Sequence, residues 1–430
     1  MKDVNIDVHY VTRVEGHANI VVNTKNGTVD ELRLEIIEAP RFFEAMVWGK
    51  SYYDIAQITC RICGICAVGH TTASLRATED ALGIVPSEQT LLLRKLILNA
   101  ETMQSHLLHD YFLVAPDFFG VGSVIPLATS HPDVVLRALR LKKLANDMCV
   151  VVGGRPVHPV SMVPGGFTHI PTAAELLSLK QRLLDAVPDL QATVELFKTL
   201  KIPAFDHQTE YVGLKSDEEY AFYDGDIASS EGWRIRPQEY LEHIKERIVR
   251  HSTCKHVGAV RDSIMVGGLA RFNLNYRQLH PMAAAAAKEL GLAGPSTNPF
   301  MISVAQLVEA IHAAEDSLAL IDQLLKRGLR DEPLVKPSRY GRGVGAVEVP
   351  RGLLIHDYTY DEQYRVTAAN LIIPTTMNMA NIEFDMRAIV PQLLAAGAPE
   401  PQIALTLEML TRAYDPCISC SVHMLDVRFV

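Results

Sequence analysis

The chain has 430 residues, of which 48% are apolar and 21% are charged, as in an ordinary globular protein with a large core. Acidic residues exceed basic residues by 50 to 41, so the net charge gives no reason to expect a nucleic acid or an anionic membrane as partner. No apolar run resembles a signal peptide or a membrane span, and we therefore predict a cytoplasmic protein without a transmembrane segment.

The N-terminal region, about residues 1–40, is predicted to form β-strands. The segments 17–24 and 28–39 alternate apolar and polar side chains, the pattern of half-buried strands. Asn26-Gly27 lies between them and is a strong signal for a tight hairpin turn. We expect an antiparallel hairpin here.

From about residue 54 to residue 330 the pattern is helical. Ser87 is a suitable N-cap for a helix that follows it, and Thr172 with Glu175 has capping-box spacing before a second long helix. Pro188 falls within that second helix and is expected to bend it. Further helices are predicted around residues 236–250, 279–290 and 303–327.

The remaining stretches are less regular. Residues 202–232 are predicted to be loops and short strands, and the Gly-, Pro- and Arg-rich stretch 331–351 is predicted to be irregular. Within it, GRGVGA (341–346) fits a dinucleotide fingerprint but lacks the strand before it and the helix after it, so we expect no nucleotide to bind. The prediction is a single domain over residues 1–430, mainly α with a minor β portion (α+β), whose C-terminal region is about 331–430.

Five of the seven cysteines lie in two short segments, TCRICGIC (59–66) and DPCISCSVH (415–423). Each segment holds a Cys-x-x-Cys pair, which places two thiolates within reach of one metal, and two pairs suit zinc, nickel or an iron–sulfur cluster. Structural zinc is the commonest use of such a set, but its cysteines usually come from one compact segment. Pairs from opposite ends favour a buried catalytic centre, and structural zinc remains the alternative. An odd cysteine count without an export signal favours reduced thiols over a disulfide framework.

The residues around the two pairs resemble the paired signatures of the large subunit of nickel–iron hydrogenases. Other stretches look like landmarks of that family in the expected order: RVEGH (13–17), PRFFE (40–44), GRPVHP (154–159), PGG (164–166), EVPRG (348–352) and IPTTMN (373–378). This resemblance covers nearly the whole chain. It implies the family's fold, a central helical bundle with an N-terminal β-sheet, and reversible cleavage of dihydrogen.

The resemblance also implies a nickel–iron centre with carbonyl and cyanide ligands on iron. Cys63 and Cys417 would be terminal nickel ligands, and Cys66 and Cys420 would bridge nickel to iron. Dihydrogen would be split heterolytically, Cys417 taking the proton and Glu15 carrying it away. A carboxylic acid suits this task because burial can bring its pKa toward neutrality.

Four residues would surround the metals, by the same resemblance. Arg351 would hydrogen-bond a cyanide, with Pro350 shaping its backbone, and Thr375 would donate to the other cyanide. Such donors orient and tune a metal centre. His70 would hydrogen-bond a bridging sulfur.

Two further groups follow from the resemblance. Asp415 and Asp117 would be carboxylates over the centre, although a turn or N-cap role is the rival interpretation for both. Glu44, His423 and the carbonyl of Ile372 would hold a second ion, magnesium or iron.

The four cysteines leave no ligand set for an iron–sulfur cluster, so we expect a small subunit with clusters and further flavin or iron–sulfur electron-transfer subunits. The family typically removes an extension after the last histidine, so residues 424–430 are a possible cleavable tail, with a maturation protease and nickel chaperones as partners. The short length resembles the cytoplasmic group coupled to soluble cofactors. The alternatives are a hydrogen-sensing subunit or a scaffold homologue from respiratory complex I, which lacks the paired cysteines.

Overall fold

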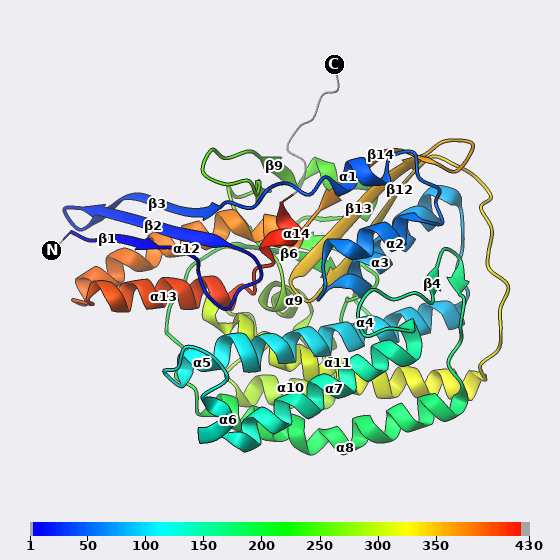
Figure 1. Ribbon diagram of the computed structural model, residues 1–430, viewed down its shortest axis with the longest axis horizontal. Coiled ribbons are helices and arrows are strands. Elements are labelled where there is room, and N and C mark those ends of the chain that lie inside the picture. The colour runs from blue at the N-terminus through cyan, green and yellow to red at the C-terminus, as the bar shows by residue number, and fades with distance from the viewer. Residues whose placement is uncertain (1–2, 423–430) are drawn as a thin grey trace.

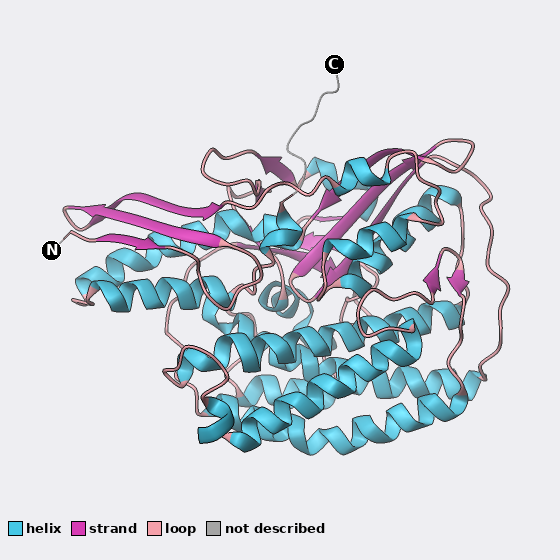
Figure 2. Cartoon of the chain, viewed as in Figure 1, coloured by secondary structure: helices cyan, strands magenta, loops and turns pink. Residues whose placement is uncertain are grey.

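The computed structural model describes residues 3–422, in which a layer of long helices lies beneath several small sheets (Figure 1). The helical layer consists of α4 (Glu88–Leu108), α7 (Pro132–Gly153), α8 (Ala173–Lys198), α10 (Pro281–Glu289) and α11 (Ile302–Arg327). Helix α11 packs against α4, α8 and α10, and α4 also packs against α7. The apolar faces between these helices form much of the core, and the predicted mainly helical α+β fold is confirmed (Figure 2).

Local signals correctly located several helix ends. The Ser87 hydroxyl accepts a hydrogen bond from the backbone N–H of Thr90 at 3.1 Å, and Thr172 with Glu175 forms the predicted capping box. Helix α8 continues from Ala173 to Lys198 with Pro188 inside it. The predicted helices at 279–290 and 303–327 are confirmed as α10 and α11.

The helix predicted at 236–250 is wrong. The chain there forms a short 3₁₀ turn at Pro237–Glu242 and then strand β9 (Lys245–Arg247), which pairs with β10 (His256–Gly258). The Tyr240 side chain is fully buried and its hydroxyl donates to Asp357 at 3.0 Å. Pairing with the next strand along the chain and burial of this ring override the local helical preference.

The N-terminal sheet is antiparallel, with β1 (Asn5–Val8), β2 (Ala18–Lys25) and β3 (Thr28–Ile36) in that order. The predicted hairpin is confirmed, since Asn26 and Gly27 both adopt positive φ angles, of 53° and 77°. Helix α12 (Pro374–Ala395) packs against β3, and α13 (Glu400–Ala413) packs against β1. The C-terminal helices therefore lie beside the N-terminal strands (Figure 1).

A second antiparallel sheet was missed by the sequence analysis. It contains β12 (Arg342–Val349), β13 (Gly352–Tyr360) and β14 (Val366–Ile372), so only the first part of the stretch 331–351 is irregular. Helix α3 (Ala67–Leu82) packs directly on β12. A Cβ on Gly343 would lie 2.1 Å from the backbone nitrogen of Ala81, and one on Gly345 would lie 2.2 Å from the carbonyl oxygen of Ala73. The glycines of GRGVGA therefore permit a close helix–strand contact.

The other elements are short. A mixed sheet has the order β11-β6-β7-β8, and the small pairs are β10-β9 and β4-β5. These strands are β4 (Met162–Val163), β5 (Gly166–Phe167), β6 (Glu210–Lys215), β7 (Asp226–Ser229), β8 (Arg234–Ile235) and β11 (Ile264–Met265). The short helices are α1 (Phe43–Val47), α2 (Ile55–Thr59), α5 (Ala115–Phe118), α6 (Leu127–Ser130), α9 (Gly268–Asn275) and α14 (Ile418–Ser421).

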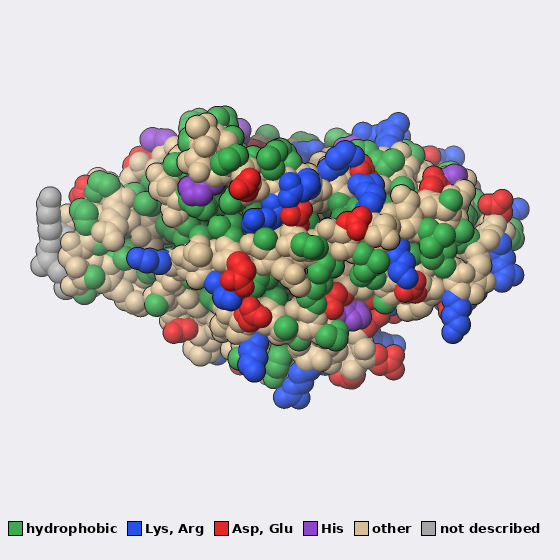
Figure 3. Space-filling model, turned by 90° about the horizontal axis from the view of Figure 1, so that it is seen from below, with side chains coloured by type: hydrophobic (Ala, Val, Ile, Leu, Met, Phe, Trp, Pro, Cys, Tyr) green, Lys and Arg blue, Asp and Glu red, His purple; other side chains and the backbone are tan. Residues whose placement is uncertain are grey.

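The outer face of the helical layer carries interspersed acidic and basic side chains (Figure 3). Ion pairs such as Arg140–Asp189 and Lys180–Asp322 lie there between α7, α8 and α11. Among residues 3–422, no helix is both long enough and apolar enough to cross a bilayer.

Candidate metal centre

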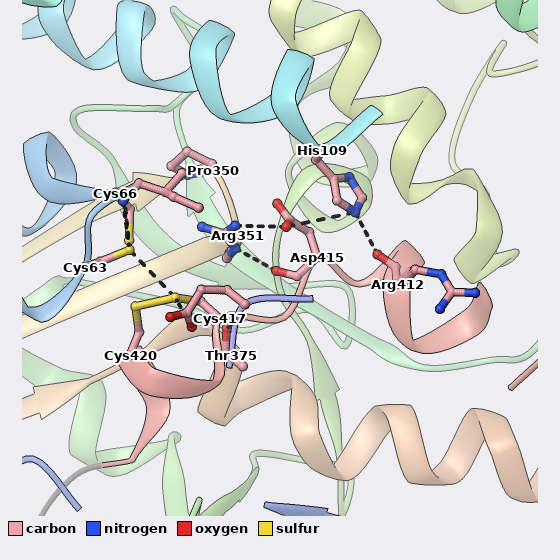
Figure 4. Close-up of polar contacts among 12 residues, drawn as sticks. Cys63, Cys66, His109, Pro350, Arg351, Thr375, Arg412, Asp415, Cys417 and Cys420 are labelled. Atoms are coloured by element: carbon pink, nitrogen blue, oxygen red, sulfur yellow. Dashed lines mark hydrogen bonds and ion pairs between the residues drawn. A yellow bond between two sulfur atoms is a disulfide. The ribbon is translucent and has the colours of Figure 1, made fainter. Parts of the chain in front are cut away.

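The sulfur atoms of the two cysteine pairs lie close together (Figure 4). The Sγ atoms of Cys63 and Cys417 are 3.7 Å apart, and those of Cys63, Cys66 and Cys420 all lie within 4.8 Å of one another. None of the four cysteines is more than 4% exposed. The two ends of the chain therefore meet around one buried sulfur cluster.

The first pair is held by backbone groups. Cys63 follows a 3₁₀ turn at Cys60–Ile62, and its Sγ accepts hydrogen bonds from the backbone N–H groups of Ile65 and Cys66, both at 3.2 Å. The hydrogen bond from the Cys66 thiol, the Arg351 charge and these N–H groups outweigh burial and lower the pKa of Cys63 to about 7. Donation to Cys63 and burial raise the pKa of Cys66 well above its ordinary value. Cys63 therefore loses its proton more readily than Cys66, and the resulting thiolate is the form that binds metal.

The second pair is joined as a disulfide between Cys417 and Cys420. The expectation of reduced thiols is therefore wrong for this pair, because the turn into α14 brings the two Cα atoms to 5.4 Å, within disulfide range. The other five cysteines are free and buried. A four-sulfur ligand set requires this disulfide to be reduced, since metals bind thiolates.

The RVEGH segment reaches the second pair through its backbone. The N–H of Ile418 donates to the carbonyl oxygen of Glu15 at 2.9 Å, and the two strands of chain bridge at Glu15 and Cys417. Gly16 has a φ of +85°, and a Cβ there would lie 2.6 Å from the Cβ of Ile418. Only glycine fits this approach without strain.

The Glu15 carboxylate lies against the second pair. Its Oε2 atom is 3.3 Å from Cys417 Sγ and accepts a hydrogen bond from the Ser419 N–H at 3.0 Å. Its Oε1 atom accepts from the Ser419 hydroxyl. Glu15 is half-buried, so its carboxylate contacts the buried sulfur of Cys417 and is also partly exposed to solvent.

Arg351 extends from the two-residue turn that joins β12 to β13. Its Nε donates to the Asp415 carbonyl oxygen at 2.7 Å and its Nη2 donates to Asp415 Oδ1 at 2.9 Å (Figure 4). Its buried Nη1 has no hydrogen-bond partner among the described residues. Beneath the turn, Arg271 donates to the carbonyl oxygens of Val349 and Pro350 at 2.8 and 3.0 Å. Asp415 and the supported turn therefore fix the guanidinium, and its Nη1 remains a donor without an acceptor among the described residues.

Thr375 and His70 each lie beside one cysteine pair. The Thr375 hydroxyl, in the first turn of α12, accepts a hydrogen bond from the Cys417 N–H at 3.0 Å. His70 lies one helical turn after Cys66, whose carbonyl oxygen accepts from the His70 N–H at 3.1 Å. The His70 ring contacts His356 at 3.2 Å between Nδ1 and Nε2.

Asp117 contacts arginines that flank the signature motifs. Its Oδ2 accepts from Arg412 Nε at 2.7 Å, and its Oδ1 binds Arg13. Among residues 3–422, no contact joins Asp117 to a cysteine of the centre. Asp110 is a further buried carboxylate, 3.8 Å from His109 Nδ1: burial and the Asp415 charge raise its pKa well above the ordinary value, and both of its oxygens lack a hydrogen-bond partner among the described residues.

Only two of the three residues expected to hold a second ion, Glu44 and Ile372, lie among the described residues. Half-buried Glu44 lies on α1, which packs against β14, the strand that ends at buried Ile372. Arg41 donates its backbone N–H to the carbonyl oxygen of Val422 at 3.0 Å. His423 and the tail 424–430 lie outside the described residues.

Glu101 was missed by the sequence analysis. Its carboxyl group accepts the backbone N–H groups of Val68 and Gly69 at 2.6 and 2.8 Å, at the start of α3 and next to Cys66. Burial raises its pKa well above the ordinary value. A glutamate on the apolar face of the helix at 88–108 was a possible signal, but only the tertiary contacts show its purpose.

The donor set fits a soft or borderline metal. Four buried sulfurs suit nickel, iron or zinc, and the spare Nη1 of Arg351 is aimed into a region that offers it no acceptor from the described residues. A ligand atom with a lone pair, carried by a bound group, would satisfy it. The disulfide must first be reduced.

Comparisons with known proteins agree with this geometry. A family model described as nickel-dependent hydrogenase matches residues 41–132 and 215–423, and one described as HoxL-like matches residues 5–39. The chain is 34% identical over 428 residues to the alpha subunit of sulfhydrogenase 1 of Pyrococcus furiosus, covering 97% of this chain and 98% of that one. It is 31% identical to an F420-non-reducing hydrogenase subunit of Methanothermobacter thermautotrophicus, covering 98% and 95% of the two chains. A solved NAD+-reducing [NiFe]-hydrogenase in the H2-reduced state superposes with a TM-score of 0.88 at 27% identity, over 98% of this chain and 100% of the other.

Proposed function

The chain belongs to the nickel-dependent hydrogenase family as a catalytic subunit, an oxidoreductase, and on that premise we propose that it cleaves dihydrogen heterolytically and reversibly at a nickel–iron centre. One observation carries the proposal: four buried cysteine sulfurs from opposite ends of the chain meet beside Glu15 and Arg351. A structural zinc site would not need a carboxylate or a guanidinium at the sulfurs.

Cys63, Cys66, Cys417 and Cys420 would hold the metals. When bound, the centre supplies the Lewis acidity and open coordination position at which dihydrogen is polarised. The surrounding protein keeps this position dry, since each cysteine is almost fully buried.

The protein would remove the proton through Cys417 and Glu15. Cys417 Sγ accepts the proton, and Glu15 Oε2, 3.3 Å away, receives it next. The Ser419 hydroxyl and N–H bind the same carboxylate and fix its orientation. Because Glu15 is half-buried, it can release the proton toward the surface.

Arg351, Pro350 and Thr375 would receive the diatomic ligands on iron. The spare Nη1 of Arg351 would donate to one cyanide, and the Thr375 hydroxyl, which accepts the Cys417 N–H, would donate its own hydrogen to another. Pro350 holds the turn that presents Arg351. His70 would support a bridging sulfur, and Asp415 would hold Arg351 in place through two hydrogen bonds.

Glu44, the Ile372 carbonyl and His423 would hold the second ion, magnesium or iron. The packing of α1 on β14 brings the first two elements together. Oxygen-rich ligands with one imidazole suit such an ion. This ion would stabilise the junction between α1 and the C-terminal segment.

The relatives are subunits of larger enzymes by name, such as the alpha subunit of the Pyrococcus sulfhydrogenase and the beta subunit of the NAD-reducing hydrogenase of Cupriavidus necator. We therefore propose that a small subunit with iron–sulfur clusters takes the electrons from this chain. Further flavin or iron–sulfur subunits would pass them to a soluble acceptor.

An infrared spectrum of the anaerobically purified complex, matured with its own partners, tests this function. Metal-bound carbonyl and cyanide stretches lie where ordinary protein groups do not absorb, and we expect both kinds together with hydrogen-dependent reduction of an artificial dye. If a matured sample held zinc at the cysteines and showed neither these bands nor dye reduction, the cysteines would form a structural zinc site and the proposed function would be wrong.

A further inference from the structure

A second cluster of metal-binding side chains lies apart from the cysteines. His251, His256 and Glu383 offer two imidazoles and a carboxylate whose ligand atoms all lie within 4.8 Å of one another. His251 is in the loop after β9, His256 begins β10, and Glu383 lies in the middle of α12. Glu383 is two helical turns beyond Thr375, about 12 Å along the axis at 1.5 Å per residue, so this cluster is distinct from the sulfur site.

From this geometry we propose that His251, His256 and Glu383 bind a divalent zinc ion. Two histidines and one glutamate are a recurrent zinc ligand set, and the fourth position is then open to water. The ligands come from three separate segments, so the ion would join the loop at 250–255, strand β10 and helix α12.

The contacts of the three side chains support the proposal. His251 Nε2 lies 2.7 Å from Glu383 Oε1, and the rings of His251 and His256 meet edge to face with centroids 5.6 Å apart. No hydrogen bond joins the His256 ring to another group within residues 3–422, although His256 is only 4% exposed. Its ring nitrogens are therefore not committed to a protein partner in this part of the chain and are available to an ion.

The surroundings hold the ligands in place. Glu383 Oε1 also accepts the backbone N–H of Leu34 at 2.9 Å, which fixes the carboxylate and leaves Oε2 free for an ion. The loop is attached to β3 because Thr253 donates its N–H to the Ile36 carbonyl oxygen at 3.0 Å. Ligands that are already oriented lose less conformational entropy on binding.

The electrostatics are compatible with a cation. Burial, with the neighbouring charges of His251 and Arg247, lowers the pKa of His256 to about 4, so its imidazole is neutral at pH 7, as a ligand must be. Arg247 itself is exposed and reaches solvent. Lys255, next to His256 in the sequence, is paired with Glu246 at 2.8 Å, and Arg250, next to His251, is exposed.

The test measures zinc in the complete complex with its metal centre loaded, so that the cysteines are occupied. After equilibrium dialysis against dilute zinc chloride, we expect wild type to retain one zinc ion per chain more than His256→Ala or Glu383→Gln. Loss of a direct ligand should weaken zinc binding by more than the roughly 10–100-fold that loss of an outer-shell partner costs. Equal zinc content in wild type and both variants would overturn the proposal.

Two further variants make the result independent of folding. His251→Gln changes a side chain that is 23% exposed and should also lose the ion while keeping the fold. His207→Gln is the matched control, because His207 is 29% exposed and pairs with Asp385 of the same helix at 2.6 Å without a second histidine. His207→Gln should keep the ion, and equal zinc loss in His207→Gln and His251→Gln would contradict a specific site.

A cobalt spectrum identifies the ligands. Cobalt(II) in the proposed site should give weak visible bands that are absent from His256→Ala. A strong near-ultraviolet band from thiolate ligation would instead place the ion at cysteines and would also contradict the proposal.

Discussion

The two Cys-x-x-Cys segments contribute the same number of sulfur atoms to the centre but have different surroundings. In the first, backbone N–H groups bind Cys63 and the buried Glu101 holds the start of α3. In the second, Glu15 lies beside the disulfide of Cys417 and Cys420. The first pair is thus surrounded by backbone donors, whereas the second lies beside a side-chain carboxylate that could take up a proton.

The largest effect should come from removing a sulfur. Cys63→Ser and Cys417→Ser should each lower nickel content and hydrogen turnover by more than about 100-fold, because direct ligation contributes more than outer-shell contacts. Cys149→Ser is the control, since Cys149 is a buried thiol on α7 that takes no part in the centre. Nickel content by mass spectrometry and hydrogen-dependent dye reduction measure the effect, and wild-type values in either ligand variant would refute the ligand assignment.

Glu15→Gln should separate proton transfer from metal binding. We expect turnover to fall about 10²–10⁴-fold, the usual contribution of a positioned acid–base group, with nickel and iron content unchanged. Glu31→Gln, on a strand surface, should have no effect. Unchanged turnover in Glu15→Gln would remove Glu15 from the proton route.

The start of α3, directly after the first segment, should be more sensitive to added volume than the segment itself. A Cβ on Gly69 would lie 2.2 Å from Val349 Cγ1 and 2.9 Å from Glu101 Oε1, whereas one on Gly64 would have no neighbour within 4 Å. Gly69→Ala should therefore destabilise the fold by about 1–3 kcal/mol through overpacking, and Gly64→Ala should not. Thermal unfolding of the two variants measures the difference, and equal melting temperatures would contradict the close packing.

The smallest expected effect concerns Asp110, near Asp415. Burial raises its pKa, so the folded state binds more protons than the unfolded state above the ordinary aspartate pKa of about 4. Its contribution to stability is therefore full below about pH 4 and decreases as the pH rises toward the folded pKa. Asp110→Asn should abolish that decrease, giving a melting temperature that falls less between about pH 4.5 and 7 than in wild type. Identical pH profiles would show that Asp110 is ionised in the folded protein.

Much of the fold could be predicted from local patterns. The turn at Asn26-Gly27, the cap at Ser87 and the capping box at Thr172 locate elements because their hydrogen bonds are made within a few residues. Strand β12 and the turn at Pro237–Glu242 could not be predicted in this way. Their conformations depend on the packing of β12 on α3 and on the hydrogen bond from Tyr240 to Asp357, which join segments far apart in the sequence.

The sequence by itself determined the chemistry of the centre, because the motifs specify which residue types are present and at what spacing. Only the tertiary structure decided which groups surround the sulfurs, such as the spare nitrogen of Arg351 and the buried carboxyl of Glu101. The same is true of the cluster of His251, His256 and Glu383. These side chains meet through packing of distant segments, and no local pattern in a single sequence encodes which buried polar groups will share a space.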